Sequence, residues 1–305
     1  MGAFFVFLVE EGEVSFYEKP TTLLFVGDIM LSRQIGAIIE REQDPLFHTL
    51  RIKDAVSEAD IAFANFENPA SDRGINQGSI YSFRAKPDLV RSLSFAGFDI
   101  VSVANNHMFD WGSDAFSDTL KHLNEYGVFP VGGGSDYSAA HSPVRIEKHG
   151  EVFCFLAYSQ FASEYVSGKN AKPAMAKLAL LAVVEDITKA KNSNCPTVII
   201  SLHWGNEYET SPTLAQKEIA HALVDAGAHL IIGHHPHVVQ PVEEYREGLI
   251  AYSLGNFIFD QNFSEDTRKG LLLRVVMHKG TIVSYDTEEV HFTDSFQPYL
   301  GSLVE

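Results

Sequence analysis

Carboxylate, amide and imidazole groups recur in this sequence directly after apolar runs of four or five residues. Such runs are typical of strands that helices cover on both faces. In open α/β sheets the ligand crevice lies beyond the carboxyl ends of the strands. We therefore expect these groups to meet at one rim and to bind a divalent metal. The candidate ligands are Asp28, Glu67, Asn106, His203, His235 and His237.

The histidines are the strongest part of this pattern. His235 and His237 flank Pro236, and in an extended segment both side chains would point the same way. Imidazole groups at strand ends are what a Zn, Mn or Fe site needs. His107, next to a candidate amide ligand, is expected to face substrate rather than metal. Four other histidines are interpreted as structural, namely His122, His141, His221 and His229.

Each candidate taken alone also has a simpler structural explanation. Asp28 follows Gly27 and could form a turn with an Asx hydrogen bond. Asn106 could occupy a left-handed turn, and Glu67 could be a solvated acid in a loop. Because five separate strand ends carry such groups, their joint occurrence favours one metal site over five unrelated turns.

Composition and charge limit the class of protein. The chain has 305 residues, of which 45% are hydrophobic, enough for one large domain or two small ones. The formal net charge of −17 makes nucleic acid and anionic membrane surfaces poor partners. Divalent cations would be attracted by this field and could reverse its sign locally for an anionic substrate. Two cysteines are too few for a disulfide scaffold, and Cys154, within an apolar run, is interpreted as a buried thiol.

Strand and helix patterns alternate along the chain, as in α/β proteins. The predicted helices span residues 87–97, 113–126, 175–191 and 213–226. Two antiparallel strand pairs are predicted, 144–148 with 152–158 and 271–277 with 282–290. A mixed sheet, or two sheets packed face to face with helices outside, fits this order. Residues 160–173 form a long loop that could be a lid or a simple excursion.

Several segments resemble the signature blocks of one family. They are residues 27–33, 65–67, 104–112, 203–208, 233–240 and 253–260. Together they cover the chain from about residue 22 to 260 and are similar to CapA-type proteins of bacterial poly-γ-glutamate capsule synthesis, relatives of the calcineurin-like metallophosphatases. The resemblance implies an α/β fold, a four-layer α-β-β-α sandwich of metallophosphatase type with mixed β-sheets.

The resemblance also implies one or two divalent ions, Mn, Zn, Fe or Mg, at the rim. The implied ligands of the first metal are Asp28 and His237, and Glu67 is the implied bridge between the two metals. The implied ligands of the second metal are Asn106, His203 and His235. The first block departs from the phosphatase pattern Asp-x-His, because its third residue is Met30. A thioether is a poor ligand for hard divalent ions, so a dinuclear, a mononuclear and a vestigial site are all open.

Two further groups of residues complete the expected site. His107 falls where the phosphatases keep the histidine that protonates a leaving oxygen, and Asp110 is expected to orient it. Arg33 and Arg84 are candidates to bind a phosphate or carboxylate, although each could instead brace a loop. Asn256 could donate a hydrogen bond into the site or only cap a turn.

The domain organisation is expected to be simple. Residues 1–20 form an apolar and acidic segment, interpreted either as the remnant of a membrane anchor or as a short strand or terminus. A single domain is expected over 21–295, followed by a tail at 296–305. The resemblance implies an extracytoplasmic, membrane-associated protein, although this chain lacks a complete signal peptide or transmembrane helix.

Three functions remain open from the sequence. The first is a role in synthesis or assembly of poly-γ-glutamate capsule or a related cell-envelope polymer. The second is a metal-dependent phosphoester hydrolase, and the third is a non-catalytic polymer-binding or assembly subunit. The expected partners are an anionic polymer or a small phosphorylated or γ-glutamyl substrate, and membrane partners of a polymer synthase complex, with no nucleic acid.

Overall fold

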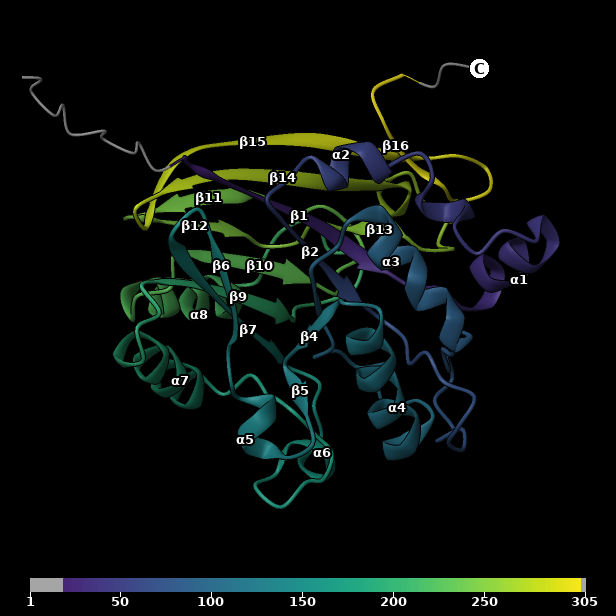
Figure 1. Ribbon diagram of the computed structural model, residues 1–305, viewed down its shortest axis with the longest axis horizontal. Helices are drawn as coiled ribbons and strands as arrows, with labels where there is room; N and C mark the ends of the chain where they lie inside the picture. Colours follow the sequence, from purple (N-terminus) through teal and green to yellow (C-terminus); the bar gives the residue numbers. More distant parts are fainter. Residues whose placement is uncertain (1–18, 303–305) are drawn as a thin grey trace, which may run out of the picture.

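A computed structural model describes residues 19–302, in which two mixed sheets face each other (Figure 1). The strands of the first sheet are β1 (Thr21–Ile29), β2 (Ile61–Phe66), β3 (Ile100–Ser102), β4 (Phe129–Val131), β13 (Asn256–Ile258), β14 (Lys269–His278), β15 (Thr281–Phe292) and β16 (Pro298–Leu300). Their order is β16-β15-β14-β1-β2-β3-β4, and β13 also pairs with β1. The parallel strands β1 to β4 form one half of this sheet.

The second sheet has a parallel centre and antiparallel edges. Its strands are β6 (Val144–Lys148), β7 (Glu151–Ser159), β9 (Thr197–His203), β10 (Leu230–His234), β11 (Val242–Tyr245) and β12 (Gly248–Ala251). They are ordered β11-β12-β10-β9-β7-β6, with β6 and β11 antiparallel to their neighbours. A small separate pair consists of β5 (Gly133–Gly134) and β8 (Ala174–Met175). Both predicted antiparallel pairs are confirmed, as β6 with β7 and as β14 with β15.

Each of the four predicted helical segments contains a helix, one of them with a shifted start, and four shorter or earlier helices were not predicted. They are α1 (Arg33–Glu42), α2 (Lys53–Ser57), α3 (Arg91–Ala96), α4 (Gly112–Glu125), α5 (Tyr137–Ala140), α6 (Glu164–Ser167), α7 (Leu180–Asn192) and α8 (Leu214–Asp225), with 3-10 turns η1 (Phe47–Thr49), η2 (Pro87–Val90) and η3 (Asp266–Arg268). The helix predicted at 175–191 begins later, because Met175 pairs in β8. At α8, Thr213 and Gln216 form a capping box that fixes the first turn.

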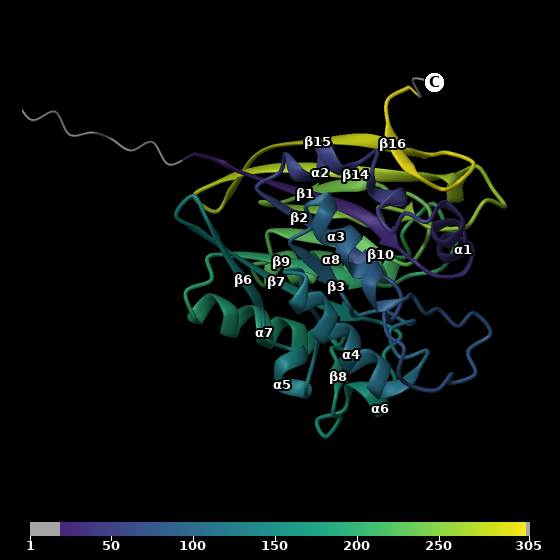
Figure 2. The ribbon, with the colours of Figure 1, turned by 45° about the vertical axis from the view of Figure 1, so that its right-hand side comes forward.

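Three apolar clusters separate four layers. Leu24 and Val26 of β1 pack with α1 to α4, while Leu23 and Phe25 of the same strand face the second sheet. The third cluster joins the other face of the second sheet to α7 and α8, which lie side by side in Figures 1 and 2. Alternate side chains of a strand point to opposite faces, so strands buried on both faces need continuous apolar runs. The predicted four-layer α-β-β-α sandwich is thereby confirmed.

The cysteine interpretation was wrong. Cys154 of β7 is joined by a disulfide to Cys195, which lies two residues before β9. The pairing arises from the sheet, since Phe153 of β7 is the register partner of Thr197 of β9. The apolar surroundings of Cys154 indicated burial correctly, but they carried no information about a partner 41 residues away.

The two ends of the chain differ in what the structure describes. The expected anchor segment at 1–20 falls almost wholly on residues 1–18, which lie outside the described residues. At the other end, Pro298–Leu300 form β16 and pair with β15, so part of the expected tail belongs to the first sheet. Within residues 19–302, none of the helices is long and apolar enough to cross a membrane.

His48 is a buried histidine in the 3-10 turn η1, and its burial predicts acid sensitivity. Its Nε2 lies 2.9 Å from the Ser295 carbonyl oxygen, and its side chain is almost completely buried. Burial lowers the pKa of His48 to about 4, against the opposing effect of the Ser295 bond. The unfolded chain therefore takes up this proton first, so stability is lost as the pH falls from about 6.5 to about 4.

We expect this group to contribute about 3 kcal/mol of that loss. His48→Gln keeps a donor for Ser295 but cannot take up the proton, so its stability should fall less steeply over the same pH range. Urea unfolding at pH 7, 5 and 4 measures the difference, with His221→Gln as the control because His221 pairs with Glu243 at the surface. An unchanged slope in His48→Gln would contradict the assignment.

Candidate metal centre

The carboxyl ends of the central parallel strands of both sheets meet at one place. In the first sheet, Asp28 of β1 is the register partner of Asn65 of β2. In the second sheet, His203 ends β9 and is paired with His234, the last residue of β10. Glu67 follows directly after β2 and is fully buried. The topology thus brings groups from distant parts of the chain to one buried rim.

Glu67 lies at the centre of this rim. Its Oε1 is 3.7 Å from His237 Nε2, 3.8 Å from His203 Nε2 and 4.0 Å from His107 Nε2. These distances are too long for hydrogen bonds, and this buried oxygen has no hydrogen-bond partner among residues 19–302. Two ligands at about 2.1 Å from a tetrahedral ion lie about 3.4 Å apart. The spacing around Glu67 therefore fits groups that share a cation.

Three sets of side chains bring ligand atoms within 4.8 Å of one another. The sets are Glu67 with His203 and His235, Asp28 with Glu67 and His237, and Glu207 with His235 and His237. The first two correspond to the second and first metal positions that the resemblance implies. Asn106, the remaining expected ligand, lies against the first set, with its Oδ1 2.7 Å from His203 Nε2. The residues present therefore fit a centre for divalent metal.

Asp28 is held as a carboxylate by its neighbours. Asn65 Nδ2 donates to its Oδ1 at 2.8 Å, and His234 Nδ1 and His237 Nδ1 each lie 3.2 Å from one of its oxygens. Burial alone would raise the pKa of Asp28, but the neighbouring His234 and His237 rings lower it well below its usual value. Asp28 is thus charged and available as a ligand.

Glu67 has the opposite tendency. Burial, followed by the negative charge of Asp28, raises the pKa of Glu67 well above its usual value, with only a partial opposing effect from Asn65. Two buried carboxyl groups so close together cannot both ionise at low cost. A divalent cation between them would remove this conflict, because its charge favours both ionised forms.

Two of the histidines are neutral in this environment. Burial, followed by the repulsion that a protonated His235 would exert, lowers the pKa of His203 well below its usual value. Burial, followed by the charge of His237, lowers the pKa of His235 to about 3. Neutral imidazole is the form that binds metal. In addition, His235 Nδ1 is buried and has no hydrogen-bond partner in the described part of the chain.

The loop that carries His235 and His237 is not extended, contrary to prediction. Both residues have left-handed backbones, with φ of 98° and 57°. Their rings still approach each other, with centroids 5.9 Å apart, because backbone contacts hold the loop. His235 N donates to Asp28 Oδ2 at 3.3 Å, and Tyr208 N donates to the Pro236 carbonyl at 2.8 Å. Both histidines therefore reach the site by a different backbone path than expected.

The environment of Met30 is that of a core residue and not of a metal ligand. Its side chain is fully buried and belongs to the apolar cluster between the first sheet and α1 to α4. Its sulfur accepts hydrogen bonds from Ser32 N at 3.1 Å and Ser32 Oγ at 3.0 Å. The first metal position therefore has one protein ligand fewer than the phosphatase pattern provides.

His107 and Asp110 form a rigid pair beside the centre. His107 Nδ1 lies 2.8 Å from Asp110 Oδ2, and the same oxygen accepts from Phe83 N at 2.8 Å. The Phe83 ring stacks on His107 with centroids 3.8 Å apart. Because Nδ1 is engaged, Nε2 is the ring nitrogen that faces Glu67 and the site.

Neither arginine presents an unengaged guanidinium to the centre. Arg33 Nε donates to Asp260 Oδ2 at 3.1 Å, and its guanidinium carbon lies 5.1 Å from the Phe83 ring centroid. The Arg84 guanidinium carbon lies 3.6 Å from the centroid of Trp111. The structure therefore places both arginines in loop contacts, the alternative already open from the sequence.

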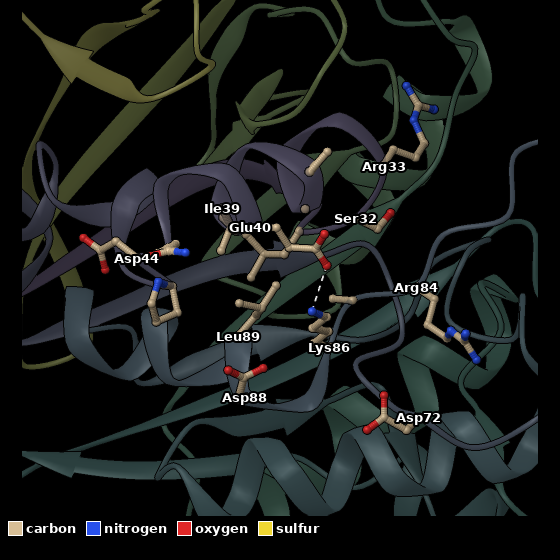
Figure 3. A pocket seen from close by; sticks show the side chains of 16 residues that line it. Ser32, Arg33, Ile39, Glu40, Asp44, Asp72, Arg84, Lys86, Asp88 and Leu89 are labelled. Carbon is tan, nitrogen blue, oxygen red and sulfur yellow. Dashed lines mark ion pairs between the residues drawn. The ribbon is translucent and has the colours of Figure 1, made fainter.

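Both arginines also line a pocket of about 510 Å³ next to α1. Figure 3 shows their side chains extending away from the ion pair between Glu40 and Lys86 in the same pocket. Phe83 contacts both Arg33 and His107, so one ring links a residue of the pocket to the His107–Asp110 pair.

Asn256 orients a predicted ligand. Its Oδ1 lies 3.0 Å from His237 Nδ1, while its Nδ2 donates to the Thr267 carbonyl at 3.0 Å. The amide is therefore fixed, and His237 keeps Nε2 for the centre. This contact positions the His237 ring.

Sequence reasoning missed several residues of the site. His234 and Asn65 contact Asp28 and lie within the signature blocks, so their position at strand ends was an available signal. Phe161, whose ring lies 4.2 Å from that of His235, comes from the loop at 160–173 and had no local signal. Gln160 of the same loop accepts from Gly205 N at 3.1 Å, so this loop packs against the centre.

Comparison with known proteins decides the family. Residues 22–261 match the bacterial capsule synthesis protein family PGA_cap. The chain belongs to this family. It is 33% identical over 274 residues to a capsule biosynthesis protein CapA of Bacillus anthracis, covering 87% of this chain and 66% of that protein. It is 31% identical over 259 residues to a PGA biosynthesis protein CapA of Bacillus subtilis, covering 84% of this chain and 67% of that protein.

Solved structures agree on the fold of this PGA_cap member. A hypothetical protein from Thermus thermophilus superposes with a TM-score of 0.54 at 18% identity, covering 88% of this chain and 98% of that one. A Haemophilus influenzae NAD nucleotidase superposes with a TM-score of 0.52 at 10% identity, covering 93% of this chain and 54% of that one. The fold is that of the calcineurin-like metallophosphatases, as the resemblance implied.

Proposed function

We propose that this protein binds divalent metal at the rim and acts with that centre in the synthesis or assembly of poly-γ-glutamate capsule or a related cell-envelope polymer. The observation that carries the proposal is the buried Glu67 Oε1, which faces the Nε2 atoms of His203 and His237 at 3.8 and 3.7 Å. A buried carboxylate oxygen surrounded by ring nitrogens at these distances is costly unless an ion lies between them.

The proposed ligands are side chains that the structure groups closely together. Asp28 and His237 would hold one ion and His203, His235 and Asn106 a second, with Glu67 between them. When bound, such an ion supplies Lewis-acid polarisation of a phosphoryl or carbonyl oxygen. Mn, Zn, Fe and Mg all remain compatible, because the set mixes imidazole with carboxylate and amide oxygens.

The chain's own residues would handle the proton. Asp110 accepts the Nδ1 hydrogen of His107 and fixes the ring, so His107 Nε2 can deliver a proton to a leaving oxygen or nitrogen. Stacking on Phe83 limits rotation of the ring about this axis. The pair is buried except for a small part of the imidazole, so it is oriented before substrate binds.

The polymer role is supported by the relatives, both of whose names refer to capsule or PGA biosynthesis. Electrostatics adds a physical reason for a metal. A chain of net charge −17 repels an anionic polymer, and bound cations would provide the local attraction for its carboxylates. The natural surroundings would then be the cell envelope, with membrane partners of a polymer synthase complex.

The test of metal binding is the metal content of the purified protein. Wild type should retain at least one equivalent of transition metal, and His203→Ala and His235→Ala should each lose most of it, because each removes an imidazole from the Glu67 set. His221→Ala is the matched control, since this histidine lies on α8 and its imidazole contacts Glu243 of β11 rather than the centre. A metal content at background level in wild type would exclude both metal-dependent polymer chemistry and metal-dependent phosphoester hydrolysis.

A second candidate function is phosphoester hydrolysis, which the fold and the His107–Asp110 pair favour. Hydrolysis of an aryl phosphate and of a γ-glutamyl amide by the metal-loaded protein separates the two chemistries. Turnover of the amide alone supports polymer processing, and turnover of the phosphate alone supports the second candidate. If neither is hydrolysed, the non-catalytic assembly role is left.

A further inference from the structure

The segment after β9 brings an acidic side chain to the mouth of the metal centre. Glu207 is exposed, and one of its oxygens lies within 4.8 Å of ligand atoms of both His235 and His237. The roles that the resemblance implies leave Glu207 unassigned.

We infer that Glu207 is a metal ligand that binds from the solvent side and replaces the ligand lost at Met30. This inference rests on the proposed metal binding and adds a residue to it. The first metal position otherwise has three ligands from one set, Asp28, Glu67 and His237. A carboxylate is a suitable fourth ligand for every divalent ion considered above.

Met30 cannot fill that place itself. Its sulfur is engaged by Ser32 and lies within the apolar cluster on the helical side of the first sheet. Glu207 approaches instead from the second sheet, from the segment that continues β9 beyond His203. Glu207 thus lies beside His237, the imidazole that also belongs to the set with Asp28 and Glu67, although it comes from a different part of the chain than Met30.

The backbone around Glu207 is anchored toward the site. Tyr208 N donates to the Pro236 carbonyl at 2.8 Å, which ties this segment to the loop that carries His235 and His237. On the other side, Gly205 N donates to Gln160 Oε1 at 3.1 Å. Only the side chain of Glu207 therefore has to move to close on an ion, and its exposure leaves room for that movement.

An unpartnered nitrogen gives an independent reason for a ligand here. The His235 residue is only 5% exposed, and its buried Nδ1 has no hydrogen-bond partner among the described residues. Such a group is costly when left unpaired and is satisfied when an ion or its ligands reach it. Glu207 belongs to the same set as this histidine.

The experiment is a calorimetric titration of metal-free protein with Mn²⁺. Glu207→Gln should raise the dissociation constant of the more weakly bound Mn²⁺ ion about tenfold or more, as expected for loss of a ligand. Glu209→Gln removes the same charge two residues away, where the side chain is also exposed, and should bind Mn²⁺ like wild type. Met30→Leu, which removes the sulfur and keeps the volume, should also bind like wild type.

Titration with Co²⁺ gives a second readout that is independent of activity. The visible absorption of bound Co²⁺ reports its coordination, so Glu207→Gln should change the spectrum and Glu209→Gln should not. Equal affinity and equal spectra for these two variants would overturn the role of Glu207 while leaving the centre intact. If wild type binds neither Mn²⁺ nor Co²⁺, the proposed metal function itself fails, which is a different result.

Discussion

Replacing His107 by asparagine is expected to lower the turnover number of the proposed hydrolysis about 10²–10⁴-fold, the usual contribution of a positioned proton donor. The reason is that Nε2 of this ring faces the centre while Nδ1 is bound by Asp110. Bound metal should remain near the wild-type amount, because His107 belongs to none of the three ligand sets found among residues 19–302. Steady-state kinetics and metal analysis on the same sample measure both quantities.

Two variants sharpen this result. Asp110→Asn should lower the turnover number less than His107→Asn, since it alters orientation and leaves the imidazole in place. His122→Asn is the control, because this histidine contacts Asp118 and Glu125 along α4, away from the centre. An unchanged turnover number in His107→Asn would exclude the proton-donor role. Loss of metal in that variant would assign His107 to the ligands instead.

Gly27→Ala is expected to lower the free energy of unfolding by about 3 kcal/mol. A Cβ at this position would overlap the carbonyl oxygen of Gly255 and approach its carbonyl carbon to 2.8 Å. That carbonyl also accepts the hydrogen bond from Asp28 N at 3.0 Å. The collision is between two backbones, so no side-chain rotation can relieve it. Asp28 should be displaced, and metal binding should weaken together with stability.

Thermal unfolding with and without Mn²⁺ measures both effects. Gly36→Ala is the matched control within α1, where a Cβ would make only an ordinary contact with the Leu31 carbonyl oxygen at 3.5 Å. A helical Gly→Ala change should stabilise by about 0.5–1 kcal/mol, the opposite sign. Wild-type stability in Gly27→Ala would contradict the close approach of β1 and the Gly255 backbone.

The layers were predictable because burial on both faces leaves a direct trace in the sequence. The run at Leu23–Val26 alternates between two apolar clusters, so every residue of it must be apolar. The rim could be located for a related reason, since parallel strands place the residues that follow them on one edge. The position of Asp28, Glu67 and His203 at strand ends is therefore enough to predict that they meet.

What local pattern could not provide was orientation and long-range pairing. The sequence around His235 and His237 carries no signal for left-handed backbones. The two side chains were predicted to lie together because the segment was expected to be extended, which it is not. Arg33 is engaged by Asp260, 227 residues away, and Cys154 by Cys195 through sheet register. Glu207 was overlooked because it lies in a turn rather than at a strand end.

The histidine loop has a consequence for how this molecule can evolve. Left-handed geometry costs an ordinary residue about 1–2 kcal/mol, and two such residues flank Pro236. Glycine at either position would relax the main chain and make the metal-free fold more robust. It would also delete an imidazole, so selection for durability alone would erode the centre. The strained backbones of His235 and His237 are therefore the cost of presenting two imidazoles at the proposed centre.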